Sequence, residues 1–467
     1  MRDRPQWPIV VGLACLLVTP AARAGLCPDQ LQNALLRSID GSSRWGLRVS
    51  RLDGRTLASF QADRAFIPAS TQKLVTSAVL LANLPVSSTL GTEVWWLEGN
   101  ADQAVLRIRG EGNPAFRYAD LQQLAEGIRQ AGVTRIRRLE LEDLPPQRWW
   151  PADWSEGDRR QDYGAPLSQL ILERNTIALE LVPQAPGQPL QARWLVPSQQ
   201  RPIQLTTQTV SPGGGEWNEG DRNGDGSGIR LSVGLRSGSE SEVAAVSSAN
   251  PSQEFTRALV AELGTRGIGV DTTRLLLPQP PLPDGPQRIV SLPSPPLAEL
   301  MTVMNHKSQN LFAEALLEAG GRQGDRTAER SSILAQARAT LSRLGLPLNG
   351  VILADGSGLS RSNRATPTFQ TELLITLVGR PDGEVFRNSL AVAGVSGTLR
   401  NRYRTPELQG RLQAKTGTLT GVKSLAGYYT PFNHPPVAFS FIGNGGGDLS
   451  AELNRLVTTL GQLESCP

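Results

Sequence analysis

Histidine is almost missing from this sequence, since only His306 and His434 occur among 467 residues. A Ser-His-Asp triad would have to use one of them, and neither lies in a triad motif. Cysteine is also scarce, so no His/Cys/carboxylate cluster has the spacing of metal ligands, and no Walker or dinucleotide-binding glycine pattern occurs. We therefore predict neither a metal nor a cofactor. If the chain has a serine nucleophile, its most economical base is a lysine.

A strong net charge and a second long apolar run are absent as well. The formal net charge is +4, and Arg2, Asp3, Arg4 and Arg23 contribute +2 of it, which leaves +2 for the rest of the chain. This excess is too weak to indicate binding to nucleic acid or to a membrane surface. Beyond residues 9–18, no stretch is long and apolar enough to cross a membrane.

The first 24 residues have the pattern of a secretory signal peptide. Two arginines precede the apolar residues 9–18, and Ala22-Arg23-Ala24 matches a small-x-small cleavage site. The apolar run is too short for a mature transmembrane helix. We predict export and cleavage after Ala24; the alternative is an uncleaved N-terminal anchor.

The remaining cysteines lie at the two ends of the mature chain. Cys15 is removed with the signal peptide, which leaves Cys27 and Cys466. In an exported protein, this placement predicts one disulfide bond that joins the termini. Two free thiols are the alternative.

The length of the chain predicts two or three domains. Residues 45–50 and 56–61 alternate as strands around an Asp-Gly turn, and residues 424–430 and 437–442 also read as strands. Strands near both ends, with helices between them, predict one sheet built from both termini. We assign residues 25–93 and 288–467 to this mixed α/β (α+β) domain, in which an antiparallel sheet is combined with helices.

The middle of the chain has a different pattern of predicted helices and strands. Two helix-Gly-strand units predict a small α/β domain from residues 94–167 and 253–287. Between its halves, residues 168–252 contain strand patterns and few helical periods, so we predict a second insertion that is mostly β. Residues 278–296 are rich in proline and are interpreted as a connection.

Ser70 and Lys73 carry the first chemical signal. Pro68 precedes them, and an apolar run that reads as a buried helix follows at residues 74–84. Three residues apart at a helix start, the two side chains lie on one face, where the amine can activate the hydroxyl. Taken alone, the pair is more simply a capping serine and a solvated lysine.

Two further motifs change this interpretation. Ser308-Gln309-Asn310 falls between two predicted helices, and Lys415-Thr416-Gly417 precedes the C-terminal strands. Ser-x-x-Lys, Ser-x-Asn and Lys-Thr-Gly, in this order and in these contexts, are the three active-site motifs of penicillin-recognising serine enzymes.

The whole mature chain resembles the class C low-molecular-mass penicillin-binding proteins, the D-alanyl-D-alanine carboxypeptidase/endopeptidase group of penicillin-binding protein 4 type. That family has a long insertion between its first two motifs, as here between Lys73 and Ser308. Further stretches also resemble the sequences of this family: residues 163–168, 305–310, 355–361, 396–398 and 414–418. The resemblance implies a penicillin-recognising, β-lactamase-like domain that carries two inserted smaller domains.

The resemblance also implies roles for the motif residues. Lys73 would take the proton of Ser70, which attacks the carbonyl between two D-alanines and forms an acyl-enzyme. Ser308 would relay a proton to the leaving D-alanine, and Asn310 would orient the substrate amide. Backbone N–H groups of Ser70 and Thr418 would hold the oxyanion.

The last motif is expected to bind the substrate. Lys415, in the Lys415-Thr416-Gly417 motif, would hold the terminal carboxylate together with the hydroxyls of Thr416 and Thr418. Arg361 is a candidate for a stem-peptide carboxylate, with a plain surface arginine as the alternative. Asp143, at a predicted strand end, is a weaker candidate for contact with the stem peptide.

The expected function is therefore that of a periplasmic or extracytoplasmic enzyme that trims peptidoglycan peptides and is inhibited by β-lactam antibiotics. The alternatives are a β-lactamase or esterase on the same scaffold and a non-catalytic wall-binding protein. The balance of carboxypeptidase and endopeptidase activity, a homodimer and a peripheral membrane association all stay open at this stage.

Overall fold

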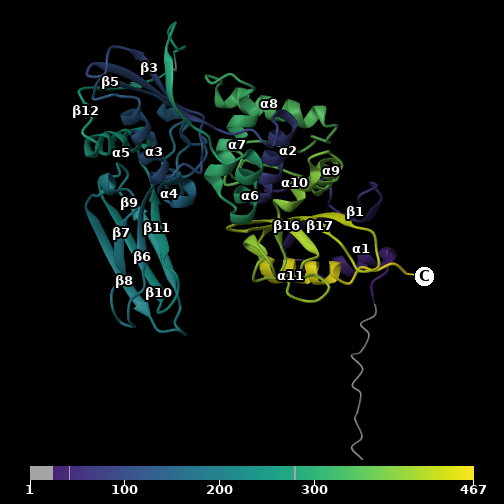
Figure 1. Ribbon diagram of the computed structural model, residues 1–467. Coiled ribbons are helices and arrows are strands. Elements are labelled where there is room, and N and C mark those ends of the chain that lie inside the picture. The colour runs from purple at the N-terminus through teal and green to yellow at the C-terminus, as the bar shows by residue number, and fades with distance from the viewer. Residues whose placement is uncertain (1–24, 42, 278–279, 467) are drawn as a thin grey trace, which may run out of the picture.

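The computed structural model describes residues 25–41, 43–277 and 280–466. The expected signal peptide at residues 1–24 therefore lies outside the described residues. The chain forms two lobes (Figure 1), one built from both ends of the sequence and one built from its middle. Within the described ranges, no helix has both the length and the apolar character that a membrane span requires.

The first lobe is organised around a six-stranded sheet in which every pair is antiparallel. Strand β1 pairs with β18, so the first strand of the chain lies beside the last. In β1, Trp45, Leu47 and Val49 are buried in one core, as their alternation predicts. The strands in sheet order are β15 (Ala391–Val392), β16 (Leu412–Leu419), β17 (Val422–Tyr429), β18 (Val437–Gly445), β1 (Ser43–Arg51) and β2 (Thr56–Phe60).

Helices cover both faces of this sheet (Figure 1). On one face, α1 (Pro28–Leu36) and α11 (Leu449–Leu460) share a core with Tyr429. Tyr428, the preceding residue of β17, belongs to the core on the opposite face, as expected from the alternation of side chains along a strand. The helices on that face are α2 (Lys73–Asn83), α6 (Leu297–Lys307), α7 (Asn310–Arg322), α8 (Arg330–Arg343), α9 (Pro367–Val378) and α10 (Gly383–Asn388).

Helix α2 is the buried axis of the helical layer, and all residues from Lys73 to Leu81 are buried. Its apolar sequence leaves no polar face for water, so neighbouring helices surround it. Ser70 lies at the start of this helix as expected, because Ala69–Gln72 form a 3-10 turn that leads directly into the α-helix at Lys73. A 3-10 turn has three residues per turn, which aligns Ser70 with Lys73 directly.

The second lobe begins with a mixed sheet of residues from two separate segments. Strand β5 pairs in parallel with β4 and with both β12 and β13, so the two helix-Gly-strand units meet in one sheet, with α3 (Tyr118–Gln130) and α5 (Pro251–Thr265) packed on its core. The strands are β3 (Thr92–Glu98), β4 (Ala104–Gly110), β5 (Arg135–Glu142), β12 (Gly269–Val270), β13 (Thr273–Leu276) and β14 (Gln287–Leu292).

Strand β14 corrects the interpretation of residues 278–296 as a plain connection. It pairs with β3 at the edge of this sheet. Of its residues only Val290 is buried, so its sequence carries little hydrophobic alternation. The boundaries expected at 93/94 and 287/288 therefore fall inside β3 and β14, because both strands belong to the inserted sheet.

The rest of the second lobe is an arm of two three-stranded sheets that share their own apolar core (Figure 1). One sheet has the order β8-β10-β9 and the other β11-β6-β7. The strands are β6 (Thr176–Val182), β7 (Gln191–Trp194), β8 (Ile203–Val210), β9 (Trp217–Arg222), β10 (Ile229–Arg236) and β11 (Glu242–Ser247). The combination of antiparallel sheets and helices confirms the expected mixed α/β class.

The two ends of the described chain lie together beside α1 and α11. Cys27 and Cys466 form a disulfide bond with their Cα atoms 5.4 Å apart. Backbone hydrogen bonds join the same segments, from Leu26 N to Gln462 O (2.7 Å) and from Glu464 N to Leu26 O (3.1 Å).

Candidate active site

Ser70 and Lys73 meet at the start of α2, where the amine has three close oxygen neighbours. Lys73 Nζ lies 3.1 Å from Ser70 Oγ, and it donates to Asn310 Oδ1 and to the Ser357 carbonyl oxygen, both at 2.7 Å. The last two oxygens are acceptors only. They use both N–H bonds of a neutral amine, which leaves its lone pair facing the Ser70 hydroxyl. The arrangement is that of a base beside its nucleophile.

Lys73 is completely buried, and this burial controls its charge. Removal from water disfavours the ammonium form and lowers the pKa of Lys73 from 10.5 to about 7, although the nearby carboxylates of Asp355 and Glu314 oppose the shift. About half of the Lys73 amine is therefore neutral near pH 7. A pKa close to the working pH suits a general base.

The loop that begins at Asp355 holds the third neighbour of Lys73 in place. Glu314 Oε1 on α7 accepts from the backbone N–H groups of Gly356 (3.0 Å) and Ser357 (2.9 Å), which directs the Ser357 carbonyl at the amine. At Gly358 φ is +84°, and a Cβ there would lie 1.9 Å from the carbonyl oxygen of Ala69. Only glycine lets this loop pass so close to the Ser70 turn.

The second and third motifs meet on the opposite side of the site. Ser308 ends α6 in the left-handed conformation, with φ 56°. Lys415 on β16 is completely buried and donates from Nζ to Ser308 Oγ (2.8 Å) and to the Thr416 carbonyl oxygen (2.9 Å). The pKa of Lys415 lies well below its usual range. Burial is the larger cause, and the positive charge of Lys73 is the smaller one. A bound carboxylate would favour its charged form and reverse this effect.

Gly417 explains how β16 comes so close to the Ser70 turn. A Cβ at this position would lie 2.1 Å from Ser424 Oγ, 2.8 Å from the carbonyl oxygen of Pro68 and 3.1 Å from the backbone nitrogen of Ser70. The absence of a side chain therefore brings the strand beside the N–H group that is expected to hold an oxyanion. Thr418 is the next residue of the strand.

The two threonine hydroxyls of this strand also have partners. Thr416 Oγ1 donates to Thr398 Oγ1 (2.9 Å), and Thr418 Oγ1 accepts from Lys423 Nζ (3.3 Å). Thr398 lies in one of the stretches that suggested the family, but no role was assigned to it from the sequence.

The inserted lobe supplies one wall of the site, which the sequence did not reveal. Asn310 Nδ2 donates to the Tyr163 carbonyl oxygen (3.0 Å), Trp154 Nε1 donates to Asp355 Oδ2 (2.9 Å), and Ser360 Oγ donates to Asp153. The one available signal was the concentration of tryptophans at residues 149–154, since aromatic residues in a loop often mark a binding surface.

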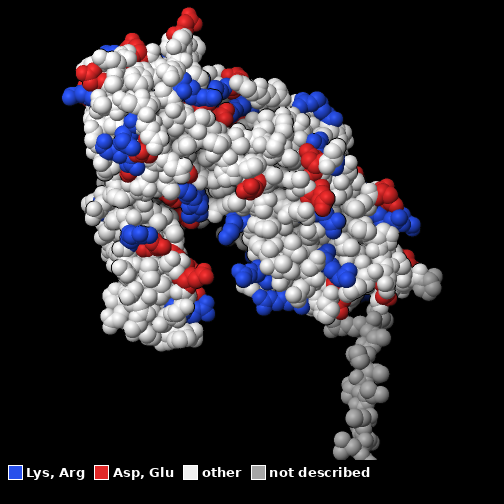
Figure 2. Space-filling model, viewed as in Figure 1, with Lys and Arg blue, Asp and Glu red and all other residues white. Residues whose placement is uncertain are grey.

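Residues of both lobes enclose a cleft of about 510 Å³ at Ser70. Arg361 lies in it and donates from Nη2 to the carbonyl oxygen of Thr420 (2.7 Å). Figure 2 shows the molecule hollowed between its two lobes, with Lys and Arg side chains on both sides of the hollow and Asp and Glu side chains on the side of the arm. The lining residues of the cleft are Ser70, Asp153, Ser155, Asp158, Tyr163, Ser308, Asn310, Gly358, Leu359, Arg361, Thr418, Leu419 and Thr420.

Asp143 is not among the cleft residues, so its predicted contact with the stem peptide is wrong. Its side chain is buried in the second lobe and accepts from Ser252 Oγ (2.6 Å) and from the backbone N–H of Gln169 (2.7 Å). Burial raises the pKa of Asp143 to about 6. A carboxylate that follows a buried strand here ties neighbouring segments together instead of facing substrate.

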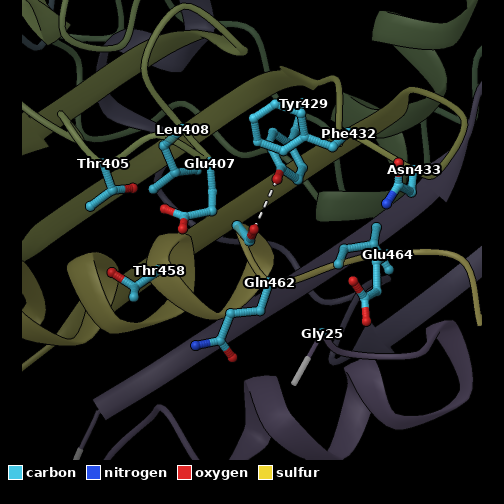
Figure 3. A pocket seen from close by; sticks show the side chains of 12 residues that line it. Gly25, Thr405, Glu407, Leu408, Tyr429, Phe432, Asn433, Thr458, Gln462 and Glu464 are labelled. Atoms are coloured by element: carbon cyan, nitrogen blue, oxygen red, sulfur yellow. Dashed lines mark hydrogen bonds between the residues drawn. The ribbon is translucent and has the colours of Figure 1, made fainter. Parts of the chain in front are cut away.

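A separate pocket of about 400 Å³ lies beside α11, near the disulfide-linked ends (Figure 3). Its lining includes Tyr429, whose hydroxyl donates to the carbonyl oxygen of Gly461 (2.9 Å), and Phe432. None of the three motifs contributes a residue to it, so this pocket is separate from the site at Ser70.

The fold and the cleft define the class of protein: a serine hydrolase with the penicillin-recognising architecture. The model of the D-Ala-D-Ala carboxypeptidase 3 (S13) family matches residues 30–460. The chain therefore belongs to this family and is a serine peptidase, as expected.

Relatives extend this finding over most of the chain. A D-alanyl-D-alanine carboxypeptidase of Actinomadura sp. (strain R39) is 26% identical over 430 residues, which are 87% of this chain and 79% of the relative. The D-alanyl-D-alanine carboxypeptidase DacB of Haemophilus influenzae is 33% identical over 196 residues, or 41% of this chain and 40% of the relative.

The fold is shared with solved structures. Penicillin-binding protein 4 of Haemophilus influenzae is 23% identical, with a TM-score of 0.75 over 92% of this chain and 98% of that chain. A predatory peptidoglycan endopeptidase of Bdellovibrio bacteriovorus reaches 0.52 at 15% identity, over 90% and 92%. The resemblance to class C low-molecular-mass penicillin-binding proteins is confirmed.

Proposed function

We propose that the protein hydrolyses the D-alanyl-D-alanine bond of peptidoglycan stem peptides through an acyl-enzyme on Ser70. The observation that carries the proposal is the completely buried Lys73, whose Nζ lies 3.1 Å from Ser70 Oγ and 2.7 Å from both Asn310 Oδ1 and the Ser357 carbonyl oxygen. This geometry favours proton removal from one hydroxyl over any structural role for the amine.

The reaction then proceeds in two stages. Lys73 Nζ takes the proton of Ser70, and Oγ forms a bond to the carbonyl carbon of the penultimate D-alanine. The C–N bond breaks, and the leaving amine of the terminal D-alanine receives a proton through Ser308. Water attacks the resulting ester and gives a proton to Lys73, which passes it to Ser70 Oγ as the C–Oγ bond breaks and the peptide acid leaves.

Substrate orientation is assigned to the third motif. Lys415 and the hydroxyls of Thr416 and Thr418 bind the carboxylate of the terminal D-alanine, which compensates the buried charge of the lysine. The backbone N–H groups of Ser70 and Thr418 hold the oxyanion, and the first is strengthened by the positive end of α2. Asn310 orients the amide of the stem peptide.

A direct test uses purified protein on monomeric and cross-linked muropeptides. We expect release of D-alanine from the monomer, with cleavage of the cross-link reporting endopeptidase activity, and a lasting adduct with a fluorescent penicillin. Rapid penicillin hydrolysis without an adduct would identify a β-lactamase instead. Absence of both D-alanine release and adduct would leave a wall-binding protein.

We also propose that the chain is exported to the periplasm or another extracytoplasmic compartment. The apolar leader, the substrate class of the family and the bonded Cys27 and Cys466 support this, because disulfides persist outside the reducing cytoplasm. N-terminal sequencing of the protein from its producing cell is expected to begin at Gly25; a chain that retains residues 1–24 would contradict cleavage.

A further inference from the structure

Arg330, the first residue of α8, stands where its charge is locally unfavourable. The positive end of the helix dipole lies at the N-terminus, so a cation in the first turn is disfavoured. This turn contains no acidic residue, and Glu329 at the N-cap makes no capping hydrogen bond with its side chain. Such a local conflict is expected where a contact with another element compensates for it. The proposed mechanism does not use Arg330.

The compensating contact is an ion pair with Glu314 on α7. Arg330 Nη2 donates to Glu314 Oε2 at 2.6 Å, and the two side chains are 19% and 2% exposed. Gly321 lets the two helices approach, because a Cβ there would lie 2.7 Å from Cγ2 of Ile333 and 3.1 Å from its carbonyl oxygen. The first turn of α8, which carries Arg330, is therefore packed against α7.

The other oxygen of the Glu314 carboxylate faces the reaction site. Oε1 accepts from the backbone N–H groups of Gly356 and Ser357. The carbonyl oxygen of Ser357 in turn accepts from Lys73 Nζ. Glu314 therefore connects Arg330 on one side to a neighbour of the base on the other. Hydrogen bonds to a carboxylate are strongest when it is ionised, so the hold on this loop depends on the charge of Glu314.

Arg330 supports that charge. Burial raises the pKa of Glu314, Arg330 lowers it, and the nearby carboxylate of Asp355 raises it further. Glu318, one turn along α7, is also buried and is paired with Arg148 from the second lobe. Among the residues that the structure describes, Arg330 is the one cation in an ion pair with Glu314. Its loss would leave a buried carboxylate without a counter-charge, which favours the protonated form.

We propose that Arg330 is a positioning residue for the acylation of Ser70. Its ion pair holds Glu314 on the backbone N–H groups of the loop, and the loop presents the Ser357 carbonyl oxygen to Lys73. The inference rests on the proposed function and adds to it a residue that does not line the cleft. Loss of Arg330 should therefore change the rate of the chemical step and leave the binding of substrate almost unchanged.

The test measures acylation by a fluorescent penicillin in single-turnover conditions, which separates the maximal acylation rate from the concentration that gives half of it. Arg330→Met keeps the length of the side chain and removes its charge. The maximal rate is expected to fall about tenfold or more, because a small displacement at a catalytic base is costly. The half-saturating concentration should change by about twofold or less. Arg330→Lys restores a cation and is expected to recover most of the lost rate.

Arg338→Met is the matched control. Arg338 is an exposed arginine on the same helix, and it donates to the backbone carbonyl oxygens of Val351 and Leu348. Both quantities should equal those of the wild type. A second comparison adds Arg330→Met to Glu314→Gln protein, in which the ion pair is already lost. The further decrease in rate should be about twofold or less, because the two residues act as one unit.

An unchanged maximal rate in folded Arg330→Met protein would overturn the inference alone. A rate in Arg330→Lys as low as in Arg330→Met would also overturn it, as would a full loss in the Glu314→Gln background. If thermal unfolding shows that Arg330→Met is not folded, Arg330→Gln replaces it with the same expected outcomes. A wild-type protein that neither releases D-alanine from a stem peptide ending in D-Ala-D-Ala nor forms a penicillin adduct would overturn the proposed function, and this inference with it.

Discussion

Replacement of Ser70 by alanine is expected to lower kcat/KM for D-alanine release by about 10⁴-fold or more, because Ser70 Oγ is the one hydroxyl among the described residues that is hydrogen-bonded to Lys73 Nζ. The fluorescent-penicillin adduct should disappear completely. Both quantities are measured on purified protein, by D-alanine assay and by gel fluorescence or intact mass.

Ser59→Ala provides the control, since Ser59 is an exposed residue of β2 and loses the same hydroxyl group away from the cleft. Its activity and adduct should equal those of the wild type. Among the described residues, Ser70 Oγ has one hydrogen-bond partner, so Ser70→Ala should cost about 1 kcal/mol of stability or less and keep the fold. An adduct that persists in folded Ser70→Ala protein would place the nucleophile elsewhere.

Replacement of Lys73 by methionine is expected to lower the acylation rate by about 10²–10⁴-fold, the usual contribution of a positioned general base. Methionine has a similar length and no basic nitrogen, so it removes the proton acceptor while filling the space. Penicillin acylation in single-turnover conditions is the measurement, with thermal unfolding to verify that the variant is folded. Acylation at the wild-type rate would exclude Lys73 as the base.

The pH profile separates a base from a structural amine. Lys73 acts when neutral and has a pKa of about 7, so the wild-type acylation rate should rise with pH through a midpoint near 7. The carboxylate of Asp355 favours the protonated amine and raises this pKa. Asp355→Asn should therefore move the midpoint to lower pH, and Lys73→Met should abolish this limb of the profile.

Glu314→Gln provides a second variant in case Asp355→Asn fails to fold, because Asp355 accepts hydrogen bonds from Gly358, Ser360 and Trp154. Glu314 also raises the pKa of Lys73, and glutamine retains the Oε1 acceptor that holds Gly356 and Ser357. Its midpoint should move in the same direction. A midpoint that stays in place in both folded variants would show that another group titrates.

Much of the first lobe could be predicted because its signals are local. The alternation of Trp45, Leu47 and Val49 predicts a half-buried strand, and the apolar run of residues 74–84 predicts a buried helix. Strand β14 was missed because Val290 is its only buried residue, and its pairing with β3 depends on backbone hydrogen bonds that leave little trace in composition.

Some residues of the site could be predicted from local signals in the sequence, and others could not. Ser70, Lys73, Ser308, Asn310 and Lys415 were identified because they belong to short motifs with fixed spacing. The Ser357 carbonyl could not be identified from the sequence, because every residue has a carbonyl oxygen and only the fold directs this one at Lys73. Asp153, Trp154 and Tyr163 come from an inserted segment whose position beside α7 follows from long-range packing. Asp143 was misplaced for the same reason.

The sequence by itself determined the three motifs, their order and the long insertion, and in a chain with two histidines it made lysine the most economical base for a serine nucleophile. The tertiary structure alone decided that Lys73 is buried against Asn310 and Ser357, and that Glu314 joins the loop of Ser357 to Arg330. The physical reason is that spacing is a property of neighbouring residues. Burial and charge compensation arise only when distant segments pack together.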